Sequence, residues 1–182
     1  PVHSYEAYKK FVGSGLRSLV IKALPEAHRD NAQINLCFDA MKDIYSNHCT
    51  IKTRPYDGVM DLLDQLKLRR IKLSILSNKA DVLTKKVASH LFPDYFETVA
   101  GLTTEALKKP NPVVALDISK TMGIAPEDLI FIGDTGIDIQ TAKNANMLAI
   151  GVSWGFRSKE ELNKSGAKHI LNQPSDLLNI LG

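Results

Sequence analysis

Apolar residues in the first 52 positions of the chain recur every three or four residues, which is the spacing of one face of an amphipathic helix. No alternation of apolar and polar residues, which would indicate a strand, occurs in this segment. Gly13-Ser14-Gly15 and Pro25 interrupt the spacing, and residues of these types end helices. We therefore predict three or four helices over residues 1–52, forming a helical-bundle domain of their own.

After Thr53 the pattern changes, because segments with helical spacing alternate with short apolar runs that are typical of buried strands. Such alternation predicts a mostly parallel sheet covered by helices. The predicted fold class is therefore α/β, with a Rossmann-like core domain over residues 53–182. The predicted strands are residues 72–76, 98–100, 129–132, 148–152 and 169–171, and the predicted helices are residues 59–69, 82–91, 112–122, 137–144 and 159–165.

Two acidic residues follow the strand predicted over residues 129–132. Asp134 comes directly after Gly133, and Asp138 lies four positions further on. In open α/β sheets, ligands bind at the carboxyl ends of the strands, and Mg²⁺ takes one or two protein carboxylates and completes its shell with water and phosphate oxygens. Asp134 could instead cap the helix that follows, and these residues alone leave both interpretations open.

Two further strand ends could reach the same edge of the sheet. Ser77 and Asn78 follow the apolar run that ends at residue 76, where a hydroxyl, an amide and the free N–H groups of the next helix could bind phosphate. Lys109 precedes Pro110, which restricts its backbone and could fix where its ammonium group points. The alternatives are that Ser77 or Asn78 starts a turn and that Lys109 is an exposed loop residue.

Composition and charge narrow the class of protein. The chain has 182 residues, of which 44% are hydrophobic and 24% are charged, as in an ordinary globular protein. The net charge of +3 is scattered along the chain, so we expect neither a nucleic-acid partner nor a membrane partner. No membrane span or signal-peptide pattern occurs, and a cytoplasmic location is expected. Cys37 and Cys49 lack metal-ligand spacing and are interpreted as packing residues.

Taken together, these segments resemble motifs two to four of the haloacid dehalogenase superfamily. The resemblance is closer still to its phosphoglycolate phosphatase-like branch, and it covers essentially the whole chain. It is carried, in order, by residues 53–59, Ser77-Asn78, Lys109-Pro110-Asn111-Pro112, Gly133-Asp134, Asp138 and residues 152–156.

The resemblance implies a phosphomonoesterase that uses Mg²⁺ and an aspartyl-phosphate intermediate. Asp134 would bind Mg²⁺, and Asp138 would hold the metal directly or through water. Ser77 and Asn78 would bind the transferring phosphoryl group and position the nucleophile. Lys109 would stabilise the charge shared by nucleophile and phosphate, in agreement with the physics of phosphoryl transfer.

The same resemblance makes the helical segment over residues 1–52 a cap that closes over the site and contacts the substrate. The cap loop expected to face the site contains Gly13 and Gly15, and Arg17 follows it. Arg17 could equally lie on a solvated helix face. We expect a small phosphorylated metabolite as the partner and a monomer or homodimer as the oligomeric state.

One family motif is missing. The first motif of the superfamily is a strand that ends in Asp-x-Asp and carries the nucleophile, and no Asp-x-Asp occurs in the chain. We expect the nucleophile upstream of residue 1, on a central strand between the strands that end near Ser77 and Asp134. Without that strand, these two strands would lie about 10 Å apart with unpaired backbone groups. The chain by itself is therefore expected to be unable to turn over substrate.

Three functional hypotheses remain open. The leading one is a Mg²⁺-dependent phosphatase of a small metabolite, with phosphoglycolate as the first candidate and a nucleotide or pyrophosphate next. The second is a phosphosugar mutase of the same superfamily, which would return the phosphate to the substrate. The third is a non-catalytic fragment that binds Mg²⁺ and phosphate.

Overall fold

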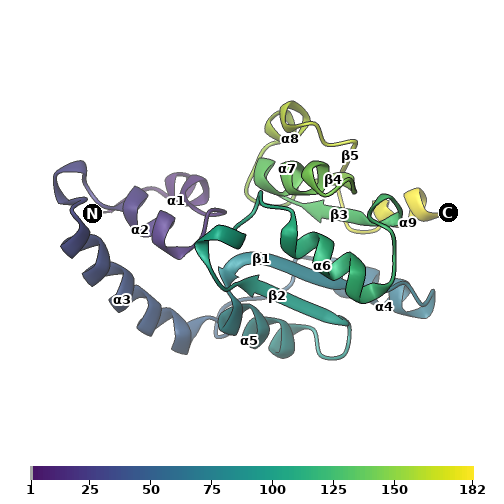
Figure 1. The fold of residues 1–182 in the computed structure, drawn as a ribbon, viewed down its shortest axis with the longest axis horizontal. Coiled ribbons are helices and arrows are strands. Elements are labelled where there is room, and N and C mark those ends of the chain that lie inside the picture. The colour runs from purple at the N-terminus through teal and green to yellow at the C-terminus, as the bar shows by residue number, and fades with distance from the viewer. Residues whose placement is uncertain (1) are drawn as a thin grey trace.

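The computed structural model describes residues 2–182, and three α-helices precede residue 53 (Figure 1). They are α1 (Tyr5–Phe11), α2 (Leu16–Ala23) and α3 (Asn31–His48), with a 3₁₀ turn at Glu26–His28. The breaks fall at the predicted glycines and proline, and Gly15 directly precedes α2 with φ +82°, a conformation that favours glycine. Within residues 2–182, no helix is both long enough and apolar enough to cross a membrane.

Helices and strands alternate through the rest of the chain, as predicted. Each strand pair that the structure contains is parallel. The elements are α4 (Val59–Leu68), β1 (Ser74–Ala80), α5 (Asp81–Leu91), β2 (Thr98–Leu102), α6 (Val113–Met122), β3 (Ile130–Gly133), α7 (Gly136–Asn144), β4 (Leu148–Val152), α8 (Lys159–Ser165), β5 (His169–Leu171) and α9 (Asp176–Leu181).

The sheet consists of two separate pieces. Strand β1 pairs with β2, and β3 pairs with β4, which pairs with β5. Strands β1 and β3 do not pair with each other in the part of the chain that the structure describes. The prediction of a parallel sheet covered by helices is confirmed. The break in the sheet falls between β1 and β3, the two strands predicted to flank a missing central strand.

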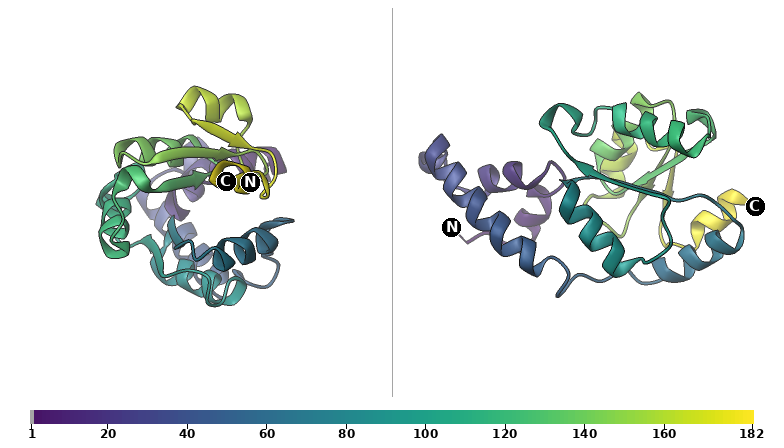
Figure 2. Two further views of the ribbon diagram at one scale, coloured as in Figure 1. Left: turned by 90° about the vertical axis from the view of Figure 1, so that its right-hand side faces the viewer. Right: turned by 60° about the horizontal axis from the view of Figure 1, so that its bottom comes forward.

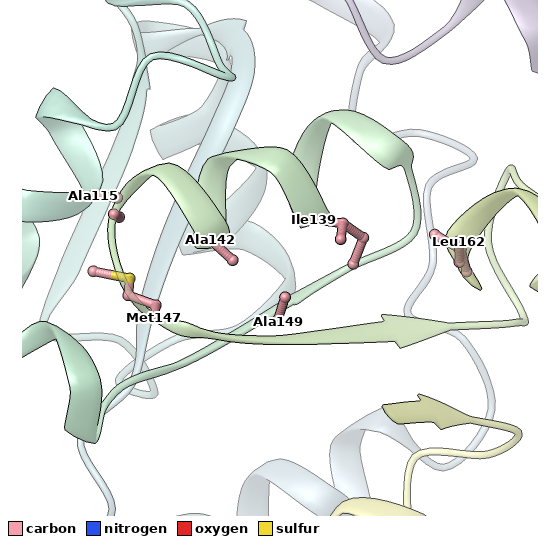
Figure 3. Packing of buried hydrophobic residues seen from close by; sticks show 7 residues of the cluster. Ala115, Ile139, Ala142, Met147, Ala149 and Leu162 are labelled. Carbon is pink, nitrogen blue, oxygen red and sulfur yellow. The ribbon is translucent and has the colours of Figure 1, made fainter. Parts of the chain in front are cut away.

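The β3–β4–β5 piece packs against a continuous apolar core. Ile139 and Ala142 of α7 are fully buried against β4, and Leu162 of α8 closes the same cluster (Figure 3). A second cluster on the other face joins Ile150 and Val152 of β4 to α4 and α9. Since helices cover both faces of this piece, β4 is a near-continuous apolar run, as expected of a buried parallel strand.

The two pieces of the sheet lie apart from each other (Figure 2, left). A cavity of about 290 Å³ is lined by residues of both pieces. Most of its lining is apolar and comes from β1 and β3 and from the helices α4 and α6 that flank them. The contributing side chains include Leu66, Leu76, Ile118, Ile130 and Ile132. The unpaired edges of β1 and β3 therefore border a space that is apolar on its walls.

The structure differs from the prediction at β1 and at the C-terminus. Strand β1 runs to Ala80 instead of ending at residue 76, so Ser77 and Asn78 lie within the strand. Between Leu76 and Ala80 the register with β2 is irregular, because more residues lie on β1 than on its partner. The C-terminal helix α9 was not predicted, and its Asp176 accepts hydrogen bonds from the backbone N–H groups of Asn172 and Gln173.

Candidate active site

Asn78 joins three segments of the chain at the end of β1. Its Oδ1 accepts a hydrogen bond from the backbone N–H of Lys109 at 2.8 Å. Its Nδ2 donates to the backbone carbonyls of Gly13 at 3.2 Å and of Lys109 at 3.3 Å. Because both amide hydrogens are used in this way, the Asn78 side chain holds the loops around the site in place. The neighbouring Ser77 hydroxyl accepts from the backbone N–H of Lys79 at 3.1 Å and keeps its own hydrogen to donate.

Lys109 connects the two pieces of the sheet. Its Nζ donates to the carbonyl of Leu76 on β1 at 3.1 Å and to Asp138 Oδ1, at the start of α7, at 2.6 Å. The Lys109 and Asp138 side chains are only 10% and 9% exposed, so this ion pair is shielded from water. Lys109 is therefore not the solvated loop lysine of the alternative interpretation.

The turn after β3 is built by Thr135. Thr135 is the N-cap residue of α7, and its hydroxyl donates to Asp138 Oδ2 at 2.6 Å. The Thr135 backbone N–H donates to the same oxygen at 3.1 Å, which completes a capping box. Asp134 therefore does not cap the helix, and its carboxylate is free for another role. The Thr-x-x-Asp spacing is the sequence signal that could have identified this cap.

Asp134 is partly buried at the carboxyl end of β3. Its Oδ2 accepts a hydrogen bond from the backbone N–H of Phe156 at 2.8 Å. Burial raises the pKa of Asp134, and the nearby charge of Asp138 raises it further against the opposing effects of the Phe156 N–H and Lys109. A divalent cation beside Asp134 would offset this cost by favouring the ionised carboxylate.

Two glycines leave room for the carboxylates. A Cβ atom on Gly133 would lie 2.1 Å from the Asp138 Cβ, and one on Gly155 would lie 2.2 Å from the Asp134 Cβ. Both distances are far below van der Waals contact, and the opposing atoms belong to the inner ends of the side chains. Any larger residue at Gly133 or Gly155 must therefore displace a carboxylate.

The carboxylates of Asp134 and Asp138 fit a magnesium ion that binds few protein ligands. No cluster of three or more His, Cys, Asp or Glu side chains suited to a metal occurs in residues 2–182. Both oxygens of Asp138 already accept hydrogen bonds, from Lys109 and Thr135. One oxygen of Asp134 accepts no hydrogen bond from another residue in the described chain. Mg²⁺ needs only one or two carboxylates, and Asp134 can supply the direct contact.

The glycine loop, defined as residues 13–15, lies against this site, whereas the Arg17 side chain bonds within the helical segment. A Cβ on Gly15 would lie 3.3 Å from the carbonyl oxygen of Asn78, and one on Gly13 would lie 3.5 Å from the Thr135 methyl group. The Arg17 guanidinium instead donates to Asn35 Oδ1 of α3 at 2.9 Å and lies 5.8 Å from the centre of the Phe38 ring. Arg17 thus joins α2 to α3.

Arg157, which follows β4, was not among the predicted site residues. Its guanidinium donates to backbone carbonyls near the end of α1, including that of Lys9 at 2.7 Å. More than 140 residues separate donor from acceptor, so no local pattern could have revealed the contact.

Comparisons of the sequence with a family model and with curated proteins agree on one family. A family model described as haloacid dehalogenase-like hydrolase matches residues 2–152. The phosphoglycolate phosphatase of Aquifex aeolicus is 30% identical over 173 residues, which are 94% of this chain and 78% of that protein. The phosphoglycolate phosphatase of Chromobacterium violaceum is 29% identical over 97% of this chain and 80% of its own length.

Solved structures show the same relationship. A crystal structure from Lactobacillus delbrueckii subsp. bulgaricus, assigned as a phosphoglycolate phosphatase, superposes with a TM-score of 0.90 at 31% identity, over 98% of this chain and 83% of that chain. A β-phosphoglucomutase from Clostridium difficile superposes with a TM-score of 0.73 at 20% identity, over 96% of this chain and 78% of its own. The second likeness concerns the fold alone.

Proposed function

Because this chain belongs to the haloacid dehalogenase-like hydrolases, we propose that its intact form is a Mg²⁺-dependent phosphatase of a small phosphorylated metabolite, with phosphoglycolate as the first candidate. The observation that carries the proposal is that Lys109 bonds both to Leu76 of β1, next to Ser77, and to Asp138, in the turn after β3 that also holds Asp134. The names of the relatives support phosphoglycolate as the substrate to test first.

The described residues would divide the work of binding and charge stabilisation. The Ser77 hydroxyl would donate to a phosphoryl oxygen, and the Lys109 ammonium would balance charge between phosphate and nucleophile. Asn78 would fix the backbone around them through its three hydrogen bonds. Asp134 would hold Mg²⁺, which when bound would neutralise phosphate charge. Asp138 would act on the metal site through water and through Lys109.

A strand between β1 and β3 would supply the nucleophile. The apolar cavity and the two facing unpaired edges support this assignment, because a parallel strand placed there would pair with both. Its carboxyl end would emerge beside Ser77, Lys109 and Asp134. An Asp at that position would attack phosphorus while the bond from phosphorus to the ester oxygen of the substrate breaks, so that the alcohol leaves and an aspartyl-phosphate remains. Water would then attack the phosphorus of the aspartyl-phosphate, which would release inorganic phosphate and restore the Asp carboxylate.

The helical segment over residues 2–52 would act as the cap. Its glycine loop lies against Asn78 and Thr135, where it would cover a phosphate bound at the strand ends. Closure would exclude water from the reacting groups and leave the space between cap and core for the remainder of the substrate. A small substrate fits this arrangement because the loop approaches the strand ends closely.

Release of inorganic phosphate tests the proposal. The native full-length protein is assayed with Mg²⁺ against phosphoglycolate, a nucleotide, pyrophosphate and a hexose phosphate, and Asp134→Asn serves as the control for background phosphatase. We expect Mg²⁺-dependent release that the variant loses by at least about a hundredfold. A hexose phosphate isomerised without phosphate release would instead indicate a mutase. Full activity of a native protein with an intact mass of 20.1 kDa would contradict the missing-nucleophile assignment.

A further inference from the structure

Arg157 makes a set of contacts that the proposed chemistry does not use. It lies in the loop between β4 and α8, and its guanidinium donates three hydrogen bonds to the helical segment. Nη1 donates to the carbonyl of Lys9 at 2.7 Å, and Nη2 donates to the carbonyls of Lys10 at 3.2 Å and Val12 at 2.9 Å. The core thus binds the end of α1 through one side chain.

The acceptors are the groups that a helix leaves without partners. The last carbonyls of α1 (Tyr5–Phe11) have no intrahelical donors, and the C-terminal end of a helix carries partial negative charge. A planar, permanently charged guanidinium can satisfy several of them at once, which an ammonium group cannot. Glu161 also holds the Arg157 guanidinium in place, since the Glu161 Oε1 lies 3.2 Å from Arg157 Nε. The Arg157 side chain is 14% exposed, so water competes weakly for these bonds.

The end of α1 leads directly into the glycine loop. A Cβ on Gly13 would lie 3.8 Å from Arg157 Nη2, so the Arg157 guanidinium packs against the glycine loop. Phe156, the residue before Arg157, donates its backbone N–H to Asp134. One short segment of the core therefore holds both the carboxylate proposed to bind the metal and the loop proposed to cover the phosphate.

We propose that Arg157 is a positioning residue that docks the end of α1 on the core and thereby sets the closed position of the glycine loop over the strand ends. The inference rests on the proposed function for its effect on substrate but not for the docking itself. An isolated helix as short as α1 is unstable in water, so its order depends on contacts of this kind. Loss of Arg157 is expected to free α1 and the loop while leaving Ser77, Lys109 and Asp134 in place.

Another contact of the same chemical type provides the matched control. Lys86 of α5 donates to the carbonyl of Ser46 near the end of α3 at 2.6 Å, so it too joins a core cation to a helix carbonyl of the segment before residue 53. That contact lies far along the chain from the glycine loop. Lys86→Ala therefore removes one bond from a core cation to a helix carbonyl of that segment without touching the loop.

Hydrogen exchange of the full-length protein tests the docking independently of catalysis. In Arg157→Gln we expect the backbone amides of residues 5–15 to exchange at least about tenfold faster, with β4 unchanged, whereas Lys86→Ala leaves residues 5–15 as in the wild type. Faster exchange throughout β4 in Arg157→Gln would indicate a general loss of structure and would overturn the proposal. Unchanged exchange at residues 5–15 would overturn it as well.

Steady-state kinetics then test the effect on the site. Arg157→Gln is expected to raise KM for phosphoglycolate about tenfold, and Arg157→Lys should recover only part of the loss because it cannot reproduce the fork. Inhibition by inorganic phosphate should weaken clearly less than KM rises, because only the covering loop is freed and the phosphate-binding groups on the core are untouched. An equal loss of phosphate affinity would place Arg157 in the phosphate site and overturn the positioning role. If the wild type releases no phosphate, the proposed function fails while the exchange experiment still decides the docking.

Discussion

Strand β4 and its neighbour β3 lie side by side in register, yet their environments differ. β4 is paired along both edges, and four of its five residues are buried. β3 is paired along one edge, and none of its four residues is buried. β1 resembles β3, since Asn78 is its one buried residue. Ser77 lies on β1 and Asp134 directly follows β3, and Lys109, from the loop before α6, bonds to Leu76 of β1 and to Asp138, whereas the well-packed strand carries none of the candidate catalytic groups. The site therefore occupies the part of the core that another strand would complete.

The strongest test of this comparison is to fill the space between β1 and β3. Extending the chain upstream by an apolar strand that ends in Asp-x-Asp should bury several apolar side chains, at about 1.5 to 3 kcal/mol each. We expect Tm to rise by about 10 °C or more and phosphatase activity to appear. Calorimetry and phosphate release measure the two effects.

The control separates packing from chemistry. An extended protein with Asn in place of the first Asp of that motif should gain the same stability without gaining turnover. Equal melting temperatures for the chain with and without the added strand would show that the cavity does not accept a strand, and the comparison of β3 with β4 would then have another cause.

The ion pair between Lys109 and Asp138 offers the next test, because it connects the two pieces of the sheet where backbone pairing is missing. Lys109→Met leaves Asp138 buried without its partner and should cost about 3 to 5 kcal/mol of unfolding free energy. In the extended protein it should also lower phosphate release by about a hundredfold or more. Urea denaturation measures the change in the free energy of unfolding.

A double-mutant cycle shows whether the pair accounts for the loss. Lys109→Met combined with Asp138→Asn should be clearly less destabilised than the sum of the two single variants, since the uncompensated charge is gone. Strict additivity of the two variants would mean that Lys109 stabilises the protein through its other bond, to the carbonyl of Leu76.

A matched pair of isoleucines measures the difference between the strands directly. Ile150 of β4 is completely buried, whereas its register partner Ile132 of β3 is 40% exposed. Ile150→Ala should cost about 2 to 5 kcal/mol, and Ile132→Ala about 1 kcal/mol or less. In the extended protein the cost at Ile132 should increase, because the added strand covers it. Equal costs in the chain without the extension would contradict the contrast in packing.

The bounds of β4, which is paired along both edges, were predicted better than those of β1, which is paired along one edge. The bounds of β4 agree with the prediction, because burial on both faces selects an uninterrupted apolar run. The end of β1 was misplaced, because Ser77 and Asn78 are typical turn residues and hydrogen bonds from the Lys109 loop keep Asn78 extended. Such bonds join distant positions and leave no local pattern.

The candidate site was predictable to a similar extent. Asp134, Asp138 and Lys109 converge because strand ends meet at one edge of a parallel sheet, which is a property of the fold class. Their individual partners were not predictable, since Thr135 takes the cap position that was the alternative role for Asp134, and Arg17 bonds to Asn35 inside the helical segment. Predicted roles for Gly13 and Gly15 toward substrate remain predictions.

The smallest expected effect distinguishes the two carboxylates of the turn after β3. Burial raises the pKa of Asp134, so the folded protein holds that proton more tightly than the unfolded chain. The contribution of this raised pKa to the stability of the fold is fully present below the pKa of Asp in the unfolded chain, about 3.9. It is lost as the pH rises through the higher pKa of the folded protein. Without divalent cations, Asp134→Asn should therefore raise Tm by a few degrees at pH 7.5, and the gain should vanish in acid. Asp138→Asn should lower Tm at pH 7.5, because its carboxylate accepts from Lys109 and Thr135. Calorimetry across pH checks both signs, and a loss of stability in both variants would mean that Asp134 is held by bonds as strong as those of Asp138.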